Sequence, residues 1–167
     1  MADGQTSGMT VRRSAGLLLF RISGGELEVL IAHMGGPAWA SRDAGAWSVP
    51  KGEYTADETP EAAARREFVE ELGLPVPDGK PVPLGETRQA GGKTVTVWAV
   101  EADLDPAAVV PGTFTMEWPR GSGRTREFPE VDRVAWMTPE EAAPRLVSGQ
   151  RVFLERLVEY VRERDES

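Results

Sequence analysis

Two apolar runs begin the patterned part of the chain. Residues 14–21 favour a β-strand, Ser23-Gly24-Gly25 is typical of a turn, and residues 27–33 form a second strand. The pattern therefore predicts a β-hairpin. The only histidine, His33, stands at the end of the second strand, with no neighbour in sequence that would orient it. A lone histidine there favours a structural role over a catalytic one.

Further strands are predicted in the second half of the chain. They span residues 84–90 and 93–104, which meet at a Gly-Gly pair, and residues 131–137. The segment 116–130 contains three arginines among glycines. We expect it to be a flexible loop rather than a core element.

Three helices are predicted. The first follows Thr59, a good N-cap, and ends at Gly73, where a left-handed cap fits. The sequence Thr-Pro-Glu-Glu at 138–141 is a capping box that should begin a helix continuing to Leu146. An amphipathic helix is expected over 150–164. Its predicted inward residues are Leu154, Leu157, Val158 and Val161.

The first helix has two contrasting faces. At about 100° per residue, Glu67, Glu70 and Glu71 fall within roughly a third of its circumference. Like charges one turn apart destabilise a helix by roughly 0.2–0.5 kcal/mol per pair. With no basic residue expected between them, they suit a hard cation such as Mg²⁺. A solvated acidic face is the alternative. The apolar stripe expected to face a core consists of Ala64, Phe68, Val69 and Leu72.

Composition narrows the class of protein. The chain has 167 residues, which favours one domain, predicted here over 11–167 after a flexible N-terminus at 1–10. Its net charge of −8 argues against long nucleic acid as a partner. It contains no cysteine, which excludes thiol catalysis and thiolate metal sites. No run approaches the ~20 apolar residues of a membrane span, so we expect a cytoplasmic protein without a membrane partner.

The acidic helix belongs to a longer spaced pattern. Gly52 is followed after five residues by Glu58 and, after seven more, by Arg66-Glu67-Phe68-Val69-Glu70-Glu71-Leu72-Gly73-Leu74. This pattern resembles the Nudix box in full. The resemblance implies an α/β/α sandwich around a mixed β-sheet. It also implies hydrolysis of a pyrophosphate linkage, in a nucleoside diphosphate joined to another group, with Mg²⁺ or Mn²⁺.

The resemblance also assigns roles within the box. Glu70, Glu71 and the Gly52 carbonyl should bind metal. Glu67 should bind metal or act as general base, with Arg66 and Glu58 orienting it. Family members have a further glutamate ligand outside the box, several residues before a tryptophan. Glu130 matches it best, before Trp136, and Glu127 and Glu117 are the alternatives.

Residues outside the box bear on the substrate. The entry Pro50-Lys51-Gly52 is similar to that of Nudix enzymes acting on dinucleoside polyphosphates, diphosphoinositol polyphosphates and some nucleoside triphosphates. Lys51 could bind a phosphate, and Trp39 could stack on a base. Each could instead have no ligand, as a solvated turn lysine and a packed aromatic. The remaining predicted substrate contacts are Arg120, Arg124 and Arg126, with a solvated surface loop as the alternative.

We therefore expect a hydrolase of dinucleoside or other polyphosphates, acting as a monomer or homodimer. The alternatives are a nucleoside triphosphate pyrophosphohydrolase that removes damaged nucleotides, and a non-enzymatic module that senses a nucleotide. The complete carboxylate set argues against the last of these.

Overall fold

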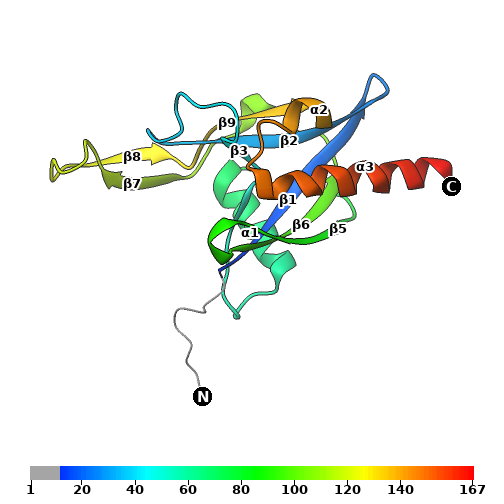
Figure 1. Cartoon of the computed structure of the whole chain (residues 1–167), viewed down its shortest axis with the longest axis horizontal. Coiled ribbons are helices and arrows are strands. Elements are labelled where there is room, and N and C mark those ends of the chain that lie inside the picture. The colour runs from blue at the N-terminus through cyan, green and yellow to red at the C-terminus, as the bar shows by residue number, and fades with distance from the viewer. Residues whose placement is uncertain (1–11) are drawn as a thin grey trace, which may run out of the picture.

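The computed structural model describes residues 12–167, and the predicted flexible segment 1–10 lies outside them. Within the described residues, seven strands form one sheet and two more form a separate hairpin (Figure 1). The main sheet contains β1 (Arg13–Ser23), β2 (Glu26–Met34), β3 (Trp47–Ser48), β4 (Lys51–Glu53), β5 (Val82–Arg88), β6 (Thr94–Glu101) and β9 (Val131–Met137). The hairpin consists of β7 (Thr113–Glu117) and β8 (Thr125–Pro129). The helices are α1 (Pro60–Leu72), α2 (Pro139–Ala142) and α3 (Arg151–Glu166).

The sheet is mixed, as predicted. Its strand order is β3-β2-β1-β6-β5, with β4 also paired to β1 and β9 also paired to β2. The β1–β6 pair is parallel and the other pairs are antiparallel. The predicted first hairpin is present as β1 and β2, which turn at Gly24 and Gly25, both with positive φ. Only glycine adopts such angles readily, so the Gly-Gly signal identified the turn correctly.

Successive side chains of the central strands point to opposite faces and fill two separate cores. The first core joins the sheet to α1 and includes Ala15, Leu17, Leu19, Leu30, Ala63, Ala64, Phe68 and Leu72. The second joins the sheet to α2 and α3 and includes Leu18, Phe20, Val29, Ile31, Ala142, Phe153, Leu154 and Leu157. The fold is therefore the predicted α/β/α sandwich.

The predicted caps of α1 are present. The Thr59 side chain accepts a hydrogen bond from the Ala62 N–H, and Gly73 is left-handed with its N–H bonded to the Val69 carbonyl. A Cβ on Gly73 would also collide with the carbonyl of Val110, so this position requires glycine. The expectation that Val69 faces the core was wrong, because its side chain is 44% exposed.

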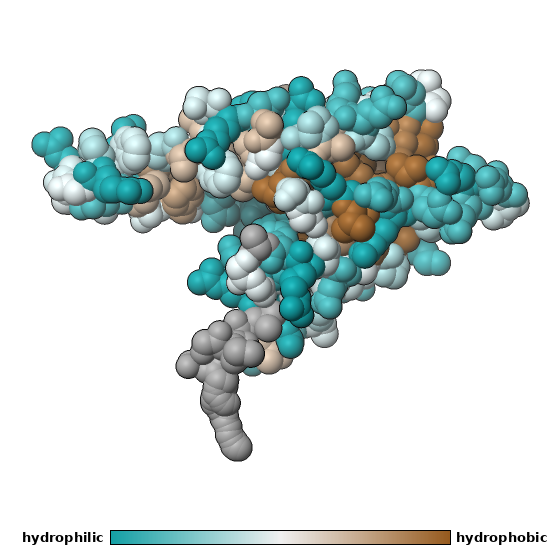
Figure 2. Space-filling model, in the orientation of Figure 1, coloured by the Kyte–Doolittle hydropathy of each residue, from teal (hydrophilic) through white to brown (hydrophobic). Residues whose placement is uncertain are grey.

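The segment predicted as a flexible loop is instead ordered as the β7–β8 hairpin. Phe114 pairs with Phe128, and Met116 pairs with Arg126. The hairpin projects from the sandwich in Figure 1, and its outer end is hydrophilic in Figure 2. The sequence prediction failed because glycines and arginines in the turn concealed the alternation of aromatic and polar residues in the strands.

The C-terminal helices agree with the prediction in kind but differ in detail. Thr138 and Glu141 form the expected capping box, yet α2 ends at Ala142 rather than at Leu146. In α3, Phe153 is fully buried although it was not among the predicted inward residues, whereas Val158 is only partly buried. Hydrophobic residues gather beside α3 on the face shown in Figure 2. None of the helices within residues 12–167 is long and apolar enough to cross a membrane.

Candidate active site

A cavity of about 450 Å³ opens beside α1 at the ends of β2 and β4. It brings together predicted site residues from distant parts of the sequence. Its lining residues are Ala32, Met34, Gly35, Trp39, Ser48, Lys51, Gly52, Glu67, Glu71, Phe114, Glu130 and Val131. Three glutamates, one lysine and two aromatic side chains therefore share one cavity.

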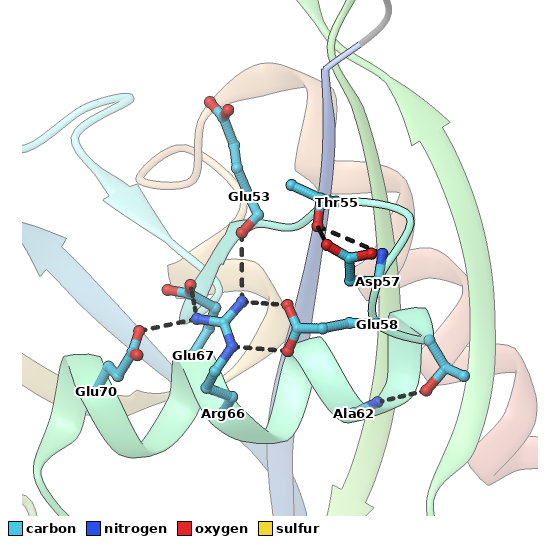
Figure 3. Close-up of polar contacts among 9 residues, drawn as sticks. Glu53, Thr55, Asp57, Glu58, Ala62, Arg66, Glu67 and Glu70 are labelled. Atoms are coloured by element: carbon cyan, nitrogen blue, oxygen red, sulfur yellow. Dashed lines mark hydrogen bonds and ion pairs between the residues drawn. The ribbon is translucent and has the colours of Figure 1, made fainter.

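Arg66 organises the carboxylates on the exposed side of α1 (Figure 3). Its Nε and Nη2 donate to both carboxylate oxygens of Glu58, at 2.7 and 2.6 Å. Its Nη1 donates to Glu67 at 2.6 Å and to Glu70 at 3.0 Å. The expectation that no basic group lies between the carboxylates was wrong. The bonds to Glu58 and Glu67 hold the pKa of Arg66 above its usual range, so Arg66 remains a cation.

The side chain of Glu67 is more buried than that of Glu70, which also binds Arg66. Its side chain is 13% exposed, whereas that of Glu70 is 53% exposed. The Glu67 Oε2 accepts from Arg66, and no hydrogen bond among residues 12–167 reaches its Oε1. Arg66 therefore holds one oxygen of Glu67, and the other lies against Gly52, which lines the cavity.

Gly52 lets Glu67 lie this close to β4. A Cβ built on Gly52 would overlap the Glu67 carboxylate, so no other residue fits without moving that side chain. Gly52 pairs with Ala15 of β1, which fixes its backbone in the sheet. The close approach of the Glu67 carboxylate thus explains why the sequence pattern begins with a glycine at position 52.

The cavity carboxylates destabilise one another's charge. The pKa of Glu71 is raised to about 8, mainly by burial and then by the charges of Glu130 and Glu67, while the charge of Lys51 opposes the rise. Burial also raises the pKa of Glu67 and of Glu130. The next cause for Glu130 is repulsion from Glu67 and Glu70. The site therefore contains negative charge that its own cations compensate only in part.

Lys51 is the cation inside the cavity. Burial lowers its pKa, which the nearby Glu71 carboxylate partly counteracts. The Lys51 backbone N–H donates to Glu71 Oε1 at 3.3 Å. Lys51 therefore lines the cavity beside the acidic cluster.

Several predicted site residues lie outside the cavity lining. Glu70 and Glu58 are on the Arg66 side of α1. Among the alternatives to Glu130, the Glu117 carboxylate accepts from Gly121 and Gly123 N–H groups at 3.0 and 2.9 Å, which stabilises the hairpin turn. Glu127 is exposed on β8. The predicted arginines Arg120, Arg124 and Arg126 lie on the hairpin, and none lines the cavity.

Sequence reasoning missed Phe114 and Ser48 in the lining. It also missed that Asp132 orients His33. His33 is fully buried and its Nδ1 lies 2.9 Å from an Asp132 oxygen. Alternation over 113–117 was the available signal for Phe114. No sequence signal pairs His33 with Asp132, because β2 and β9 are far apart in the chain.

The donor set fits a hard divalent cation. Within residues 12–167, no three acidic or histidine side chains form a ready cluster for a metal ion. Mg²⁺, however, retains several waters and takes one or two carboxylates directly, so an open oxygen-lined cavity suffices. The pKa values of Glu67, Glu71 and Glu130 are all raised, which is the direction expected where negative charges lack a cation to balance them.

The sequence-family model of the NUDIX domain matches residues 10–157 of the chain. The chain belongs to the NUDIX family. Nudix hydrolases act on nucleoside diphosphate derivatives and generally use divalent metal ions such as Mg²⁺, and this chain is a pyrophosphohydrolase of that family. A comparison with curated proteins found no match.

Several solved structures share this fold. The chain is 19% identical to the C. elegans Ap4A hydrolase in a binary complex, covering 91% of this chain and 98% of that one, with a TM-score of 0.65. The NUDIX domain of Shewanella oneidensis NrtR with ADP ribose is 16% identical. The match covers 91% of this chain and 89% of that one, with a TM-score of 0.60. The M. smegmatis Nudix hydrolase RenU is 28% identical. The match covers 92% of this chain and 88% of that one, with a TM-score of 0.58.

The raised pKa of Glu71 makes stability depend on pH. Its ordinary value is 4.5, so between that pH and about 8 the folded protein binds more protons than the unfolded chain. Without divalent metal, Glu71 therefore destabilises the protein increasingly as pH rises through this range. We expect Glu71→Gln to gain stability over the parent protein by on the order of 1 kcal/mol per pH unit. Urea unfolding from pH 5 to 8 in chelator measures this.

The control is Glu155→Gln, at an exposed position on α3, which should follow the parent protein at every pH. An unchanging difference between Glu71→Gln and the parent protein would contradict the buried-charge account.

Proposed function

We propose that this chain hydrolyses dinucleoside polyphosphates or similarly long nucleoside polyphosphates. The observation that supports this best is the β7–β8 hairpin, one face of which leads outward from the cavity. Phe114 lines the cavity and pairs with Phe128, and the next pair on the same face is Met116 and Arg126. Arg124 continues this face, since its carbonyl accepts from the Trp118 N–H at 2.9 Å.

This arrangement matches a substrate that is longer than the cavity. A strand advances about 3.4 Å per residue, so Arg126 lies roughly 7 Å along β8 from the aromatic pair. A nucleotide held between Trp39 and Phe114 would leave further phosphates near these cations. Arg126 stacks on Phe128 at 5.4 Å, and its guanidinium forms no ion pair among the described residues. The Ap4A hydrolase with the same fold supports this substrate class.

The metal site in this proposal uses Glu71, Glu130 and the Gly52 carbonyl, with Glu70 at its outer side. A divalent cation bound there would supply positive charge to phosphate oxygens and lower the pKa of a water molecule. Glu71 lines the cavity from α1, and Glu130 lines it from the connection between β8 and β9. Lys51 contacts a phosphate as a point charge.

Glu67 acts as the general base in this proposal. Arg66 holds its Oε2, and Glu58 fixes Arg66 through two bonds. The Oε1 can then accept a proton from the attacking water without rotating away. The raised pKa of Glu67 suits this role, because a carboxylate with a higher pKa is a stronger base and accepts the proton of water more readily.

A nucleoside triphosphate or a short diphosphate-linked substrate is the second candidate. The cavity of about 450 Å³ can hold one nucleotide without contacts to the hairpin beyond Phe114. The NrtR domain bound to ADP ribose shares the fold. A substrate of this kind would not extend to Arg124 and Arg126, which allows the two candidates to be separated.

The metal role of Glu130 can be tested directly. Glu130→Gln should increase the Mg²⁺ concentration needed for half-maximal activity, or lower kcat, because a charged oxygen is lost from the cavity. Losing one such group typically costs on the order of 10²-fold in kcat. Mn²⁺ binding by calorimetry gives a readout independent of turnover. Glu117→Gln is the control, since Glu117 serves only the hairpin turn. Larger effects for Glu117 than for Glu130 would refute the assignment.

Substrate length can be tested with the double variant Arg124→Ala/Arg126→Ala. Each charge-assisted bond contributes roughly 1.5–3 kcal/mol, so losing both should increase KM for a dinucleoside tetraphosphate by about tenfold or more. KM for ADP-ribose should change little. The control is Arg151→Ala/Arg162→Ala on α3, which removes the same charge away from the cavity. Equal changes for both substrates would favour the short substrate.

A further inference from the structure

His33 is a buried histidine that the proposed chemistry does not use. It is fully buried at the end of β2, and both ring nitrogens have partners. Nδ1 lies 2.9 and 3.0 Å from the two carboxylate oxygens of Asp132. Nε2 lies 2.6 Å from the carbonyl oxygen of Arg42. A carbonyl oxygen only accepts, so the ring donates its Nε2 hydrogen to Arg42.

This second bond reaches the loop that contains Trp39. The Arg42 N–H donates to the Trp39 carbonyl at 2.9 Å, closing a single turn between them. The Arg42 guanidinium also lies 5.8 Å from the centre of the Trp39 ring. His33 is therefore linked to Trp39 through one residue.

The other anchors of the loop hold different residues. Trp47 Nε1 donates to Asp43 at 2.9 Å, and Arg145 Nε donates to the same carboxylate at 3.1 Å. These contacts fix the end of the loop next to β3. The Arg42 carbonyl is thus the point at which the buried core holds the turn of Trp39.

We propose that His33 is a positioning residue that sets the place of Trp39 in the cavity wall, and thereby the affinity for the nucleotide base. The proposal rests on the proposed function, in which Trp39 contacts that base. Trp39 is half-buried, packing against the second core on one side and lining the cavity on the other, so the position of its turn sets how far the ring reaches into the cavity. The carboxylates that surround the scissile linkage lie on other elements. Loss of the bond should therefore affect binding rather than the chemical step.

Two substitutions separate the two bonds of His33. The amide nitrogen of glutamine reaches the place of Nε2, so His33→Gln can retain the bond to Arg42. The shorter asparagine can place its amide nitrogen near Nδ1, so His33→Asn retains only the bond to Asp132. We expect His33→Asn to increase KM by about five- to tenfold and His33→Gln to increase it much less. In both variants kcat should stay within about twofold.

The test is a double-mutant cycle with Trp39→Ala, measuring KM and kcat on a dinucleoside tetraphosphate together with urea unfolding. If His33 acts through Trp39, then His33→Asn raises KM in the parent protein but not in Trp39→Ala. Equal effects in both backgrounds would overturn the proposal, as would equal KM values for the asparagine and glutamine variants. Unfolding curves identify a variant that has lost its fold. If the asparagine variant is lost, the glutamine variant decides the result, because it keeps the bond to Arg42 and must keep KM near that of the parent protein; a five- to tenfold increase in its KM would overturn the proposal.

The outcome also separates this inference from the proposed function. If Trp39→Ala leaves KM unchanged for every nucleotide, the base contact in the proposed function is wrong. If Trp39→Ala raises KM while the effect of His33→Asn is additive, the base contact stands and the positioning role of His33 is rejected.

Discussion

The repulsion among carboxylates along α1 is the constraint on which the rest of the site depends. Glu67 and Glu71 on α1 and Glu130 between β8 and β9 cannot share a cavity without compensation. Arg66 supplies part of it by binding Glu58, Glu67 and Glu70 together. The deeper pair, Glu71 and Lys51, lies where water is largely excluded. The protein thus places unbalanced negative charge inside the cavity and leaves the balance to a ligand.

Such an arrangement opposes stability and requires a well-packed frame. The two cores on either side of the sheet supply that frame, because the alternating side chains of β1 and β2 are buried on both faces. Phe68 and Leu72 hold the inner side of α1 in place. The acidic side of the same helix can then remain where the sheet puts it, although its charges repel.

The β7–β8 hairpin connects the site to the surface. At its base the Gly35 N–H donates to the Glu130 carbonyl at 3.0 Å, and the Glu130 N–H donates to the Gly112 carbonyl at 2.8 Å. The first bond therefore holds the base of the hairpin to the chain after β2, and the second joins the two arms of the hairpin at that base. An isolated two-stranded hairpin is marginally stable, so these contacts decide where Glu130 and Phe114 stand. The same base would bring a bound polyphosphate to the arginines beyond it.

The sequence alone determined the elements whose signals are local. Caps and periodicity placed α1, the Gly-Gly turns located two strand connections, and the spacing of Gly52, Glu58 and the acidic helix identified the family. Tertiary structure decided what depends on distant contacts. The burial of Glu71 beside Lys51 and the link from His33 to the Trp39 turn join residues whose separation in space no pattern encodes. The hairpin was mistaken for a loop for the same reason, since its strands are ordered by each other and by the sheet at their base.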